Sequence, residues 1–138
     1  MVRLLHARRA VLATVEVNDG QLRVTSVGPL RQLWFQGKDG QHLQTEVVLR
    51  DGQVDLRRSL RRTPYLNFMA AQLRSADVKE VLVCGLGGGL LPHVLSSWGI
   101  QVLALERSGE VLDLARRFFG LAPAVTPLEI QKNLRGRL

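Results

Sequence analysis

The chain has 138 residues, 46% of them hydrophobic, which suits a single globular domain of ordinary composition. Nineteen Lys and Arg residues against twelve Asp and Glu residues give a net charge of +7. This excess fits an acidic partner such as RNA or an acidic protein surface, but the sequence has no RNA-binding signature with interleaved aromatic residues and few aromatic residues to stack bases. We therefore expect a solvated basic face and no nucleic-acid site. The single cysteine excludes an internal disulfide and a multi-cysteine metal site.

The first 55 residues predict a small antiparallel sheet. A β-rich run over residues 10–17 precedes the turn signal Asn18-Asp19-Gly20, and a second run covers residues 21–27. This order predicts a β-hairpin. Two further runs, over residues 30–35 and 44–49, predict a third and a fourth strand.

A helix is predicted to begin at Thr63-Pro64, because Thr can cap the free amide groups and Pro at the first helical position loses no hydrogen bond. Its apolar stripe consists of Leu66, Met69, Ala70 and Leu73. Tyr65 comes just before this stripe. Its side chain either reaches a ligand pocket or only anchors the helix.

The next segment reads as a strand, a glycine turn, a helix and a strand. Residues 81–84 are a short β-rich run of the kind found in buried parallel strands, and the glycines begin at Gly85. The second run, residues 101–106, ends in Glu106, about twenty residues after the first glycine, where a carboxylate can accept hydrogen bonds from two ribose hydroxyls. The pattern predicts a nucleotide-binding βαβ unit with parallel strands and a right-handed crossover. Cys84, at the end of the first strand, is expected to pack as a small core hydrophobe.

Two helices are predicted here, one within this unit and one after it, and both carry apolar stripes that should face the sheet. The stripes consist of Leu91, Val94, Leu95 and Trp98, and of Val111, Leu112, Ala115 and Phe119. Ser108 stands where it can cap the second helix.

The spacing of the glycines distinguishes between ligands. A dinucleotide fingerprint, G-x-G-x-x-G, needs a third glycine at the position of Leu90. The glycines here instead follow the G-x-G-x-G pattern that is typical of class I methyltransferases, and we predict S-adenosylmethionine as the cofactor. The candidate binding residues are Gly85, Leu86, Gly87, Gly88, Gly89, Glu106 and Arg107. The sequence identifies neither a catalytic residue nor a metal site.

Three segments resemble the spermidine-synthase-like branch of class I methyltransferases: residues 81–92, Leu-Ala-Leu-Glu-Arg at 103–107, and Leu-Ala-Arg-Arg-Phe-Phe-Gly at 114–120. The likeness is greatest to methyltransferase-like proteins that modify translation elongation factor 1A. It extends upstream through Leu33-Trp-Phe35, Gln44-Thr-Glu46 and Tyr65, and so covers about residues 31–121. The resemblance implies an α/β fold in which a small antiparallel sheet, residues 1–55, precedes a partial Rossmann-like sheet that binds S-adenosylmethionine, residues 56–121. It also implies a protein substrate.

The chain departs from this family in three places. The polyamine synthases have Asp at the position of Gly88, and a Tyr-His-Glu segment where Tyr65-Leu66-Asn67 stands here, so aminopropyl transfer is the less favoured activity. The family usually has Asp-Pro after the strand-end acid, whereas Arg107-Ser108-Gly109 follows Glu106 in this chain. The loop around the ribose contact is therefore expected to differ.

Residues 122–138 are expected to form a divergent basic tail, so that only two parallel strands are predicted. The relatives continue with an acidic segment that contacts adenine and with a strand that carries catalytic residues. We therefore expect a C-terminally truncated form with weak or no methyltransferase activity. The alternative is a noncatalytic remnant, either a cofactor binder or a protein-interaction module, and whether the chain is an enzyme stays open.

Association and location are expectations of the same kind. In the resembled family the N-terminal sheet often mediates dimer contacts, so a homodimer through this sheet is one alternative, and a sheet that only packs on the main domain is the other. No apolar stretch is long enough to span a membrane. We expect a cytoplasmic chain. A mitochondrial presequence is less favoured, because residues 1–9 carry arginines but no serine.

Overall fold

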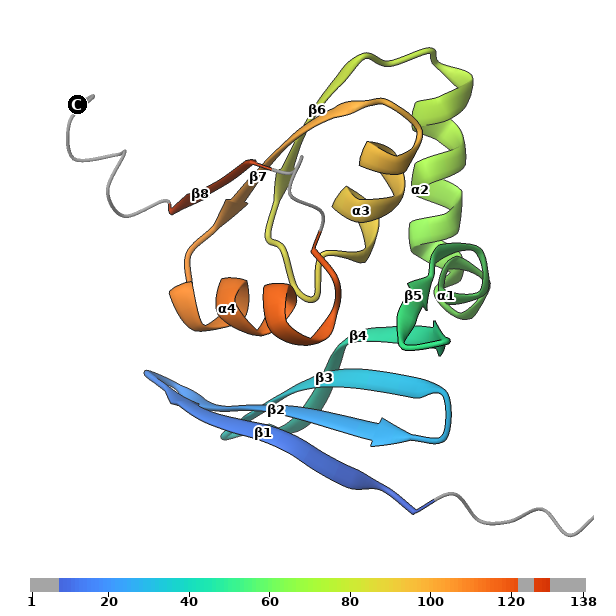
Figure 1. Cartoon of the computed structure of the whole chain (residues 1–138). Helices are drawn as coiled ribbons and strands as arrows, with labels where there is room; N and C mark the ends of the chain where they lie inside the picture. Colours follow the sequence, from blue (N-terminus) through green and yellow to red (C-terminus); the bar gives the residue numbers. More distant parts are fainter. Residues whose placement is uncertain (1–7, 122–125, 130–138) are drawn as a thin grey trace, which may run out of the picture.

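The computed structural model describes residues 8–121 and 126–129, which form two sheets with helices beside and between them (Figure 1). The first sheet has five strands in the order β1-β2-β3-β4-β5, all of them antiparallel. The second has three parallel strands in the order β6-β7-β8. The chain is thus a mixed α/β fold with an N-terminal antiparallel sheet, as predicted.

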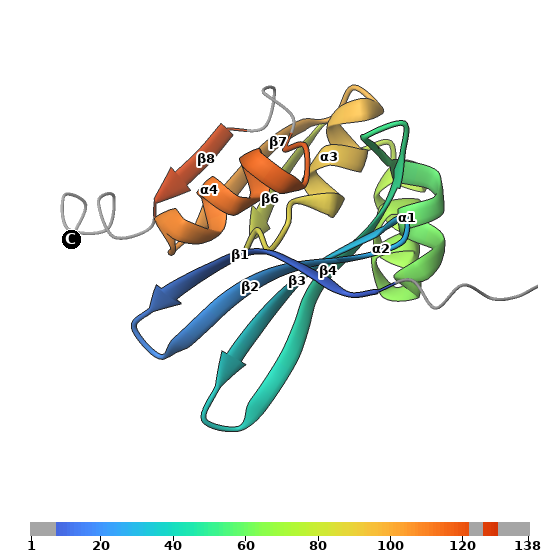
Figure 2. The same cartoon turned by 60° about the horizontal axis from the view of Figure 1, so that its bottom comes forward.

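The N-terminal sheet contains the predicted hairpin and one strand more than expected. The strands are β1 (Ala10–Val17), β2 (Gly20–Val27), β3 (Leu30–Gly37), β4 (Gly40–Arg50) and β5 (Gln53–Asp55). β3 and β4 are longer than predicted because Gly37 pairs with Gly40, so only two residues separate the strands. Asp51 and Gly52, both with positive φ, turn the chain from β4 into β5. Figure 2 shows how the sheet extends below the rest of the molecule.

Two helices connect the sheets. α1 (Leu56–Arg62) is capped by Asp55, whose side chain accepts a hydrogen bond from the amide of Arg58. α2 (Pro64–Ser75) begins where predicted, but the expected side-chain cap is wrong: Thr63 makes no capping hydrogen bond through its side chain. Only its carbonyl contributes, by accepting the amide of Asn67.

The apolar stripe of α2 faces the core only in part. Ala70 is buried, and Leu66 and Leu73 are half-buried, but Met69 is 45% exposed. Met69 lies instead on the wall of a cleft, together with Leu66. The expectation that the whole stripe packs against the sheet is therefore corrected for Met69.

The predicted βαβ unit is confirmed as β6 (Glu80–Cys84), α3 (Leu90–Ser97) and β7 (Gln101–Glu106), with β6 and β7 parallel. It is followed by α4 (Gly109–Phe118). Ser108 caps α4 as predicted, because its hydroxyl accepts the amide of Val111 at 3.3 Å. α3 buries Leu91, Val94 and Leu95 of its predicted stripe, and Trp98 is half-buried.

The prediction that Cys84 is a core residue is wrong, because its side chain is exposed. Successive side chains of a strand point to opposite faces of the sheet. Val81 and Val83 of β6 pack against the core, so Leu82 and Cys84 lie on the other face. Leu82 is 56% exposed there, since no described helix covers it.

The expectation of only two parallel strands is also wrong. Within the predicted basic tail, β8 (Thr126–Glu129) pairs in parallel with β7, from Leu103 with Thr126 to Glu106 with Glu129. Residues 122–125 and 130–138 of that tail lie outside the described residues.

One cluster of buried side chains joins the two sheets, so the N-terminal sheet packs on the α/β unit. It includes Leu22, Val24, Leu33 and Val47 from the antiparallel sheet and Leu95, Leu114 and Phe119 from the α/β unit. At the edge of this core, Arg31 of β3 donates a hydrogen bond of 3.0 Å to the carbonyl of Phe118 at the end of α4. The interface fixes the position of the glycine turn relative to β4.

Candidate functional site

A cleft of about 970 Å³ opens between the two sheets. One wall consists of the turns that follow β6 and β7, at the carboxyl ends of these parallel strands, where α/β sheets place their ligands. The opposite wall comes from the β1–β2 turn, β3, β4 and α2. Five of the seven predicted binding residues line the cleft: Gly85, Leu86, Gly87, Glu106 and Arg107.

The turn after β6 requires glycine because of its backbone conformation. Gly85, Gly87 and Gly89 have φ angles of 86°, 55° and 81°, a region that residues with a Cβ rarely adopt. Between them, the side chain of Leu86 is only 6% exposed and anchors the turn in the core.

Gly88 and Gly89 lie behind the cleft wall, and steric contacts within the protein explain both. A Cβ on Gly88 would lie 2.7 Å from Cγ2 of Thr45 and 3.1 Å from Cδ1 of Phe119. A Cβ on Gly89 would lie 2.8 Å from Cδ1 of Leu121. Close approach of neighbouring elements of the protein thus explains why both positions are glycines.

Glu106 is held in a fixed orientation by the backbone. Its Oε2 accepts the amide of Leu86 at 2.8 Å, and its Oε1 accepts the amide of Ser108 at 3.0 Å. A carboxylate offers about four lone-pair sites, so two such bonds leave acceptor capacity for hydroxyl groups in the cleft. The predicted acid is therefore a positioned hydrogen-bond acceptor.

The amides of the glycine turn are mostly engaged within the protein. Gly85 donates to the carbonyl of Leu105, Leu86 to Glu106, Gly88 to Oγ1 of Thr45, and Gly89 to the carbonyl of Leu86. Of these five successive residues, only Gly87 has an amide without an acceptor among the described residues. A pyrophosphate site needs several free amides that point at the anion. The turn therefore does not form a phosphate cradle.

Gln44 and Thr45 are cleft residues that the sequence did not identify as a site. The pairing of β3 with β4 shifts between Leu33 and Trp34: Leu33 pairs with Thr45, and Trp34 pairs with Leu43. Gln44 is thus an extra residue, as in a β-bulge. The only sequence signal for Gln44 and Thr45 was the Gln-Thr-Glu segment of the family resemblance, and no role was predicted for that segment.

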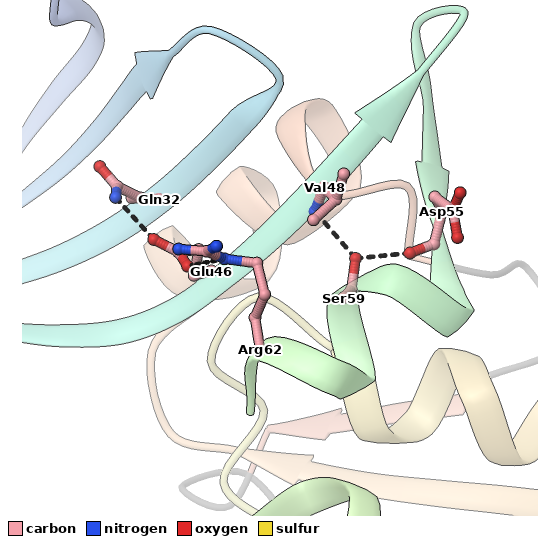
Figure 3. Close-up of polar contacts among 6 residues, drawn as sticks. All are labelled: Gln32, Glu46, Val48, Asp55, Ser59 and Arg62. Carbon is pink, nitrogen blue, oxygen red and sulfur yellow. Dashed lines mark hydrogen bonds and ion pairs between the residues drawn. The ribbon is translucent and has the colours of Figure 1, made fainter. Parts of the chain in front are cut away.

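A polar network fixes the strand that carries Thr45 (Figure 3). Glu46 accepts hydrogen bonds from Nε2 of Gln32 at 2.7 Å and from Nε of Arg62 at 2.5 Å. Burial raises the pKa of Glu46, but the hydrogen bonds from Gln32 and Arg62 and the charge of Arg62 outweigh burial and lower that pKa overall. Two residues further along β4, the amide of Val48 donates to the hydroxyl of Ser59 in α1 at 2.8 Å.

Tyr65, whose role the sequence left open, lies on the cleft wall and is 63% exposed. Asp19 and Glu110 lie at the same cleft, and both are exposed. The pKa of Glu110 is lowered by a hydrogen bond from its own backbone amide and by one from Ser108. The cleft is therefore lined by exposed acidic side chains as well as by Arg107.

Among the described residues, no group of three or more His, Cys, Asp or Glu side chains is placed to hold a metal ion. In the same part of the chain, none of the helices has the length and apolar character needed to cross a membrane.

Comparison with known proteins gives structural matches only. No family model matches the chain, and no curated protein matches it in sequence. Among solved structures, spermidine synthase from Thermotoga maritima matches with a TM-score of 0.47 and 17% identity over 86% of the chain. A spermidine synthase in complex with the transition-state analogue AdoDATO gives the same values. The chain spans 39% of the length of each of these two proteins.

Proposed function

We propose that this chain binds S-adenosylmethionine, or its demethylated product, in the cleft and has the cofactor-binding half of a class I methyltransferase. The observation that carries the proposal is the geometry of Glu106, whose carboxylate is held at the cleft by the amides of Leu86 and Ser108. A ribose with two free hydroxyls is the ligand group that suits such an acceptor.

The state of the glycine turn supports the choice among adenosine ligands. Four of its five amides already donate to acceptors of the protein, which disfavours a pyrophosphate such as that of NAD. S-adenosylmethionine has no phosphate, so it requires no such cradle. For the longer proteins of the family that the chain resembles, the activity proposed here is methyl transfer to a protein substrate.

Aminopropyl transfer to a polyamine is a less favoured proposal. The resemblance places an Asp of the polyamine synthases at Gly88. Here even a Cβ at this position would meet Cγ2 of Thr45 at 2.7 Å, so the chain cannot hold an acidic side chain there without rearranging β4.

A second candidate is a noncatalytic binder of the same cofactor. Methyl transfer depends on positioning the nucleophile and on removing water from it. The wall opposite Glu106 is solvated, because Tyr65 is 63% exposed and Asp19 is exposed as well. This observation supports binding more than turnover, so we propose weak or no activity for the isolated chain.

Calorimetric titration with S-adenosylmethionine, S-adenosylhomocysteine and NAD tests the proposal. We expect binding of the first two, weaker or no binding of NAD, and loss of binding in Glu106→Ala. Glu80→Ala, the same change at an exposed acid of β6 that does not line the cleft, is the matched control and should bind as the unaltered chain does. Thermal unfolding of each variant separates lost binding from lost folding.

Preference for NAD would overturn the proposal. Transfer of a labelled methyl group to protein substrates would favour the methyltransferase over the noncatalytic binder.

A further inference from the structure

We infer that Thr45 is a positioning residue of the cofactor site, because it holds the glycine turn in the shape that binds the adenosine ligand. Thr45 belongs to the N-terminal sheet and precedes the turn by about forty residues, so nothing in the local motif points to it. The inference rests on the proposed function and assigns a role to the second wall of the cleft.

Two kinds of contact join Thr45 to the turn. Its Oγ1 accepts the amide of Gly88 at 2.8 Å, and its Cγ2 lies 2.7 Å from where a Cβ of Gly88 would stand. Oγ1 also lies 2.8 Å from the corresponding position on Gly87. The hydroxyl fixes the position of the turn through its hydrogen bond. The hydroxyl and the methyl group together leave no space for a side chain at positions 87 and 88.

The irregularity in β4 explains why Thr45 reaches the turn. In a regular strand, Gln44 and Thr45 would point to opposite faces of the sheet. The extra residue at Gln44 breaks this alternation, and both residues line the cleft. β-Bulges redirect side chains in this way near functional sites.

The neighbours of Thr45 prevent it from moving away. Glu46, the next residue, is bonded to Gln32 in β3 and to Arg62 in α1 (Figure 3). Gly88 is buried, so its amide has no access to water as a replacement acceptor. Loss of the hydroxyl would leave that amide unpaired, which costs more than a hydrogen bond normally contributes.

Three variants test the role of the hydroxyl. Thr45→Val replaces the hydroxyl with a methyl group of similar size, and Thr45→Ser keeps the hydroxyl but removes Cγ2. Thr14→Val makes the same chemical change at an exposed position of β1 and serves as the control. We expect Thr45→Val to bind S-adenosylhomocysteine about tenfold more weakly, because the free turn would relax to give its unpaired amide another partner and would have to regain its shape on binding. The dissociation constants of Thr45→Ser and Thr14→Val should lie within about twofold of that of the unaltered chain.

Amide hydrogen exchange in the absence of ligand provides an independent measurement. The amide of Gly88 should be protected in the unaltered chain and in Thr45→Ser, and should exchange faster in Thr45→Val. Equal affinity of Thr45→Val and the unaltered chain would overturn the inference, as would unchanged protection of Gly88. Protection that follows the prediction, in a chain that binds no adenosine ligand, would contradict the proposed function and leave Thr45 only the role of holding the turn.

Discussion

The two walls of the cleft are built in different ways. The wall after β6 and β7 consists mainly of backbone: a glycine turn in which four of five amides are paired, and an acid held by the amides of Leu86 and Ser108. The opposite wall consists of side chains from the β1–β2 turn, β3, β4 and α2. Thr45 of this wall accepts a hydrogen bond from the glycine turn. A motif contiguous in sequence thus forms one wall, and it depends on a distant strand for its shape.

The largest expected effect tests whether the two walls share one core. Phe119 is 2% exposed, and its Cδ1 lies 3.1 Å from where a Cβ of Gly88 would stand. Phe119→Ala should therefore lower the free energy of unfolding by about 3–5 kcal/mol. Phe68, which is 66% exposed, is the control. Phe68→Ala should change the free energy of unfolding by less than about 0.5 kcal/mol. Denaturation with urea measures both. Similar losses for the two variants would mean that the walls do not pack as described.

A smaller effect tests the contact between the walls. Gly88→Ala introduces a Cβ against Thr45 and Phe119 and should cost about 1–3 kcal/mol of stability. Because Thr45→Ser removes the nearest atom, the cost of Gly88→Ala should fall in that background, and a double-mutant cycle measures the difference. Gly85→Ala is the control, since its Cβ would meet no atom within 4 Å and only its positive φ opposes the change. Additive effects of the two substitutions would show that Thr45 and Gly88 do not touch.

The smallest effect concerns the anchor of β4 and depends on pH. The folded state lowers the pKa of Glu46 from its ordinary value of 4.5, so the stabilisation from this group is present above that value. It is lost as the pH falls from 4.5 through the lower folded pKa. Glu46→Gln should remove this component from the pH dependence of stability. The measurement is stability as a function of pH, from about pH 5 to about pH 2, the range in which a carboxylate titrates. Identical curves for the unaltered chain and Glu46→Gln would contradict this prediction.

Local patterns predicted much of the fold. The hairpin of β1 and β2, the parallel pair of β6 and β7, and the cap at Ser108 are confirmed because each depends on residues close together in the chain. β5 was missed although Asp51-Gly52 is a hairpin signal, since the strand has only three residues. The burial of Cys84 was predicted wrongly, because the sequence does not state which face of a parallel sheet the helices cover.

The sequence by itself determined where a glycine turn follows the first parallel strand and which acid ends the second, because glycine spacing and the position of Glu106 are properties of a short segment. Only the tertiary structure decided why Gly88 is a glycine and where the amides of the turn are paired. The physical reason is that Thr45 meets Gly88 across 43 positions of the chain, and an extra residue in β4 is what directs it there. Neither the strand pairing that shifts at Gln44 nor the packing that closes on Gly88 is encoded in any local pattern.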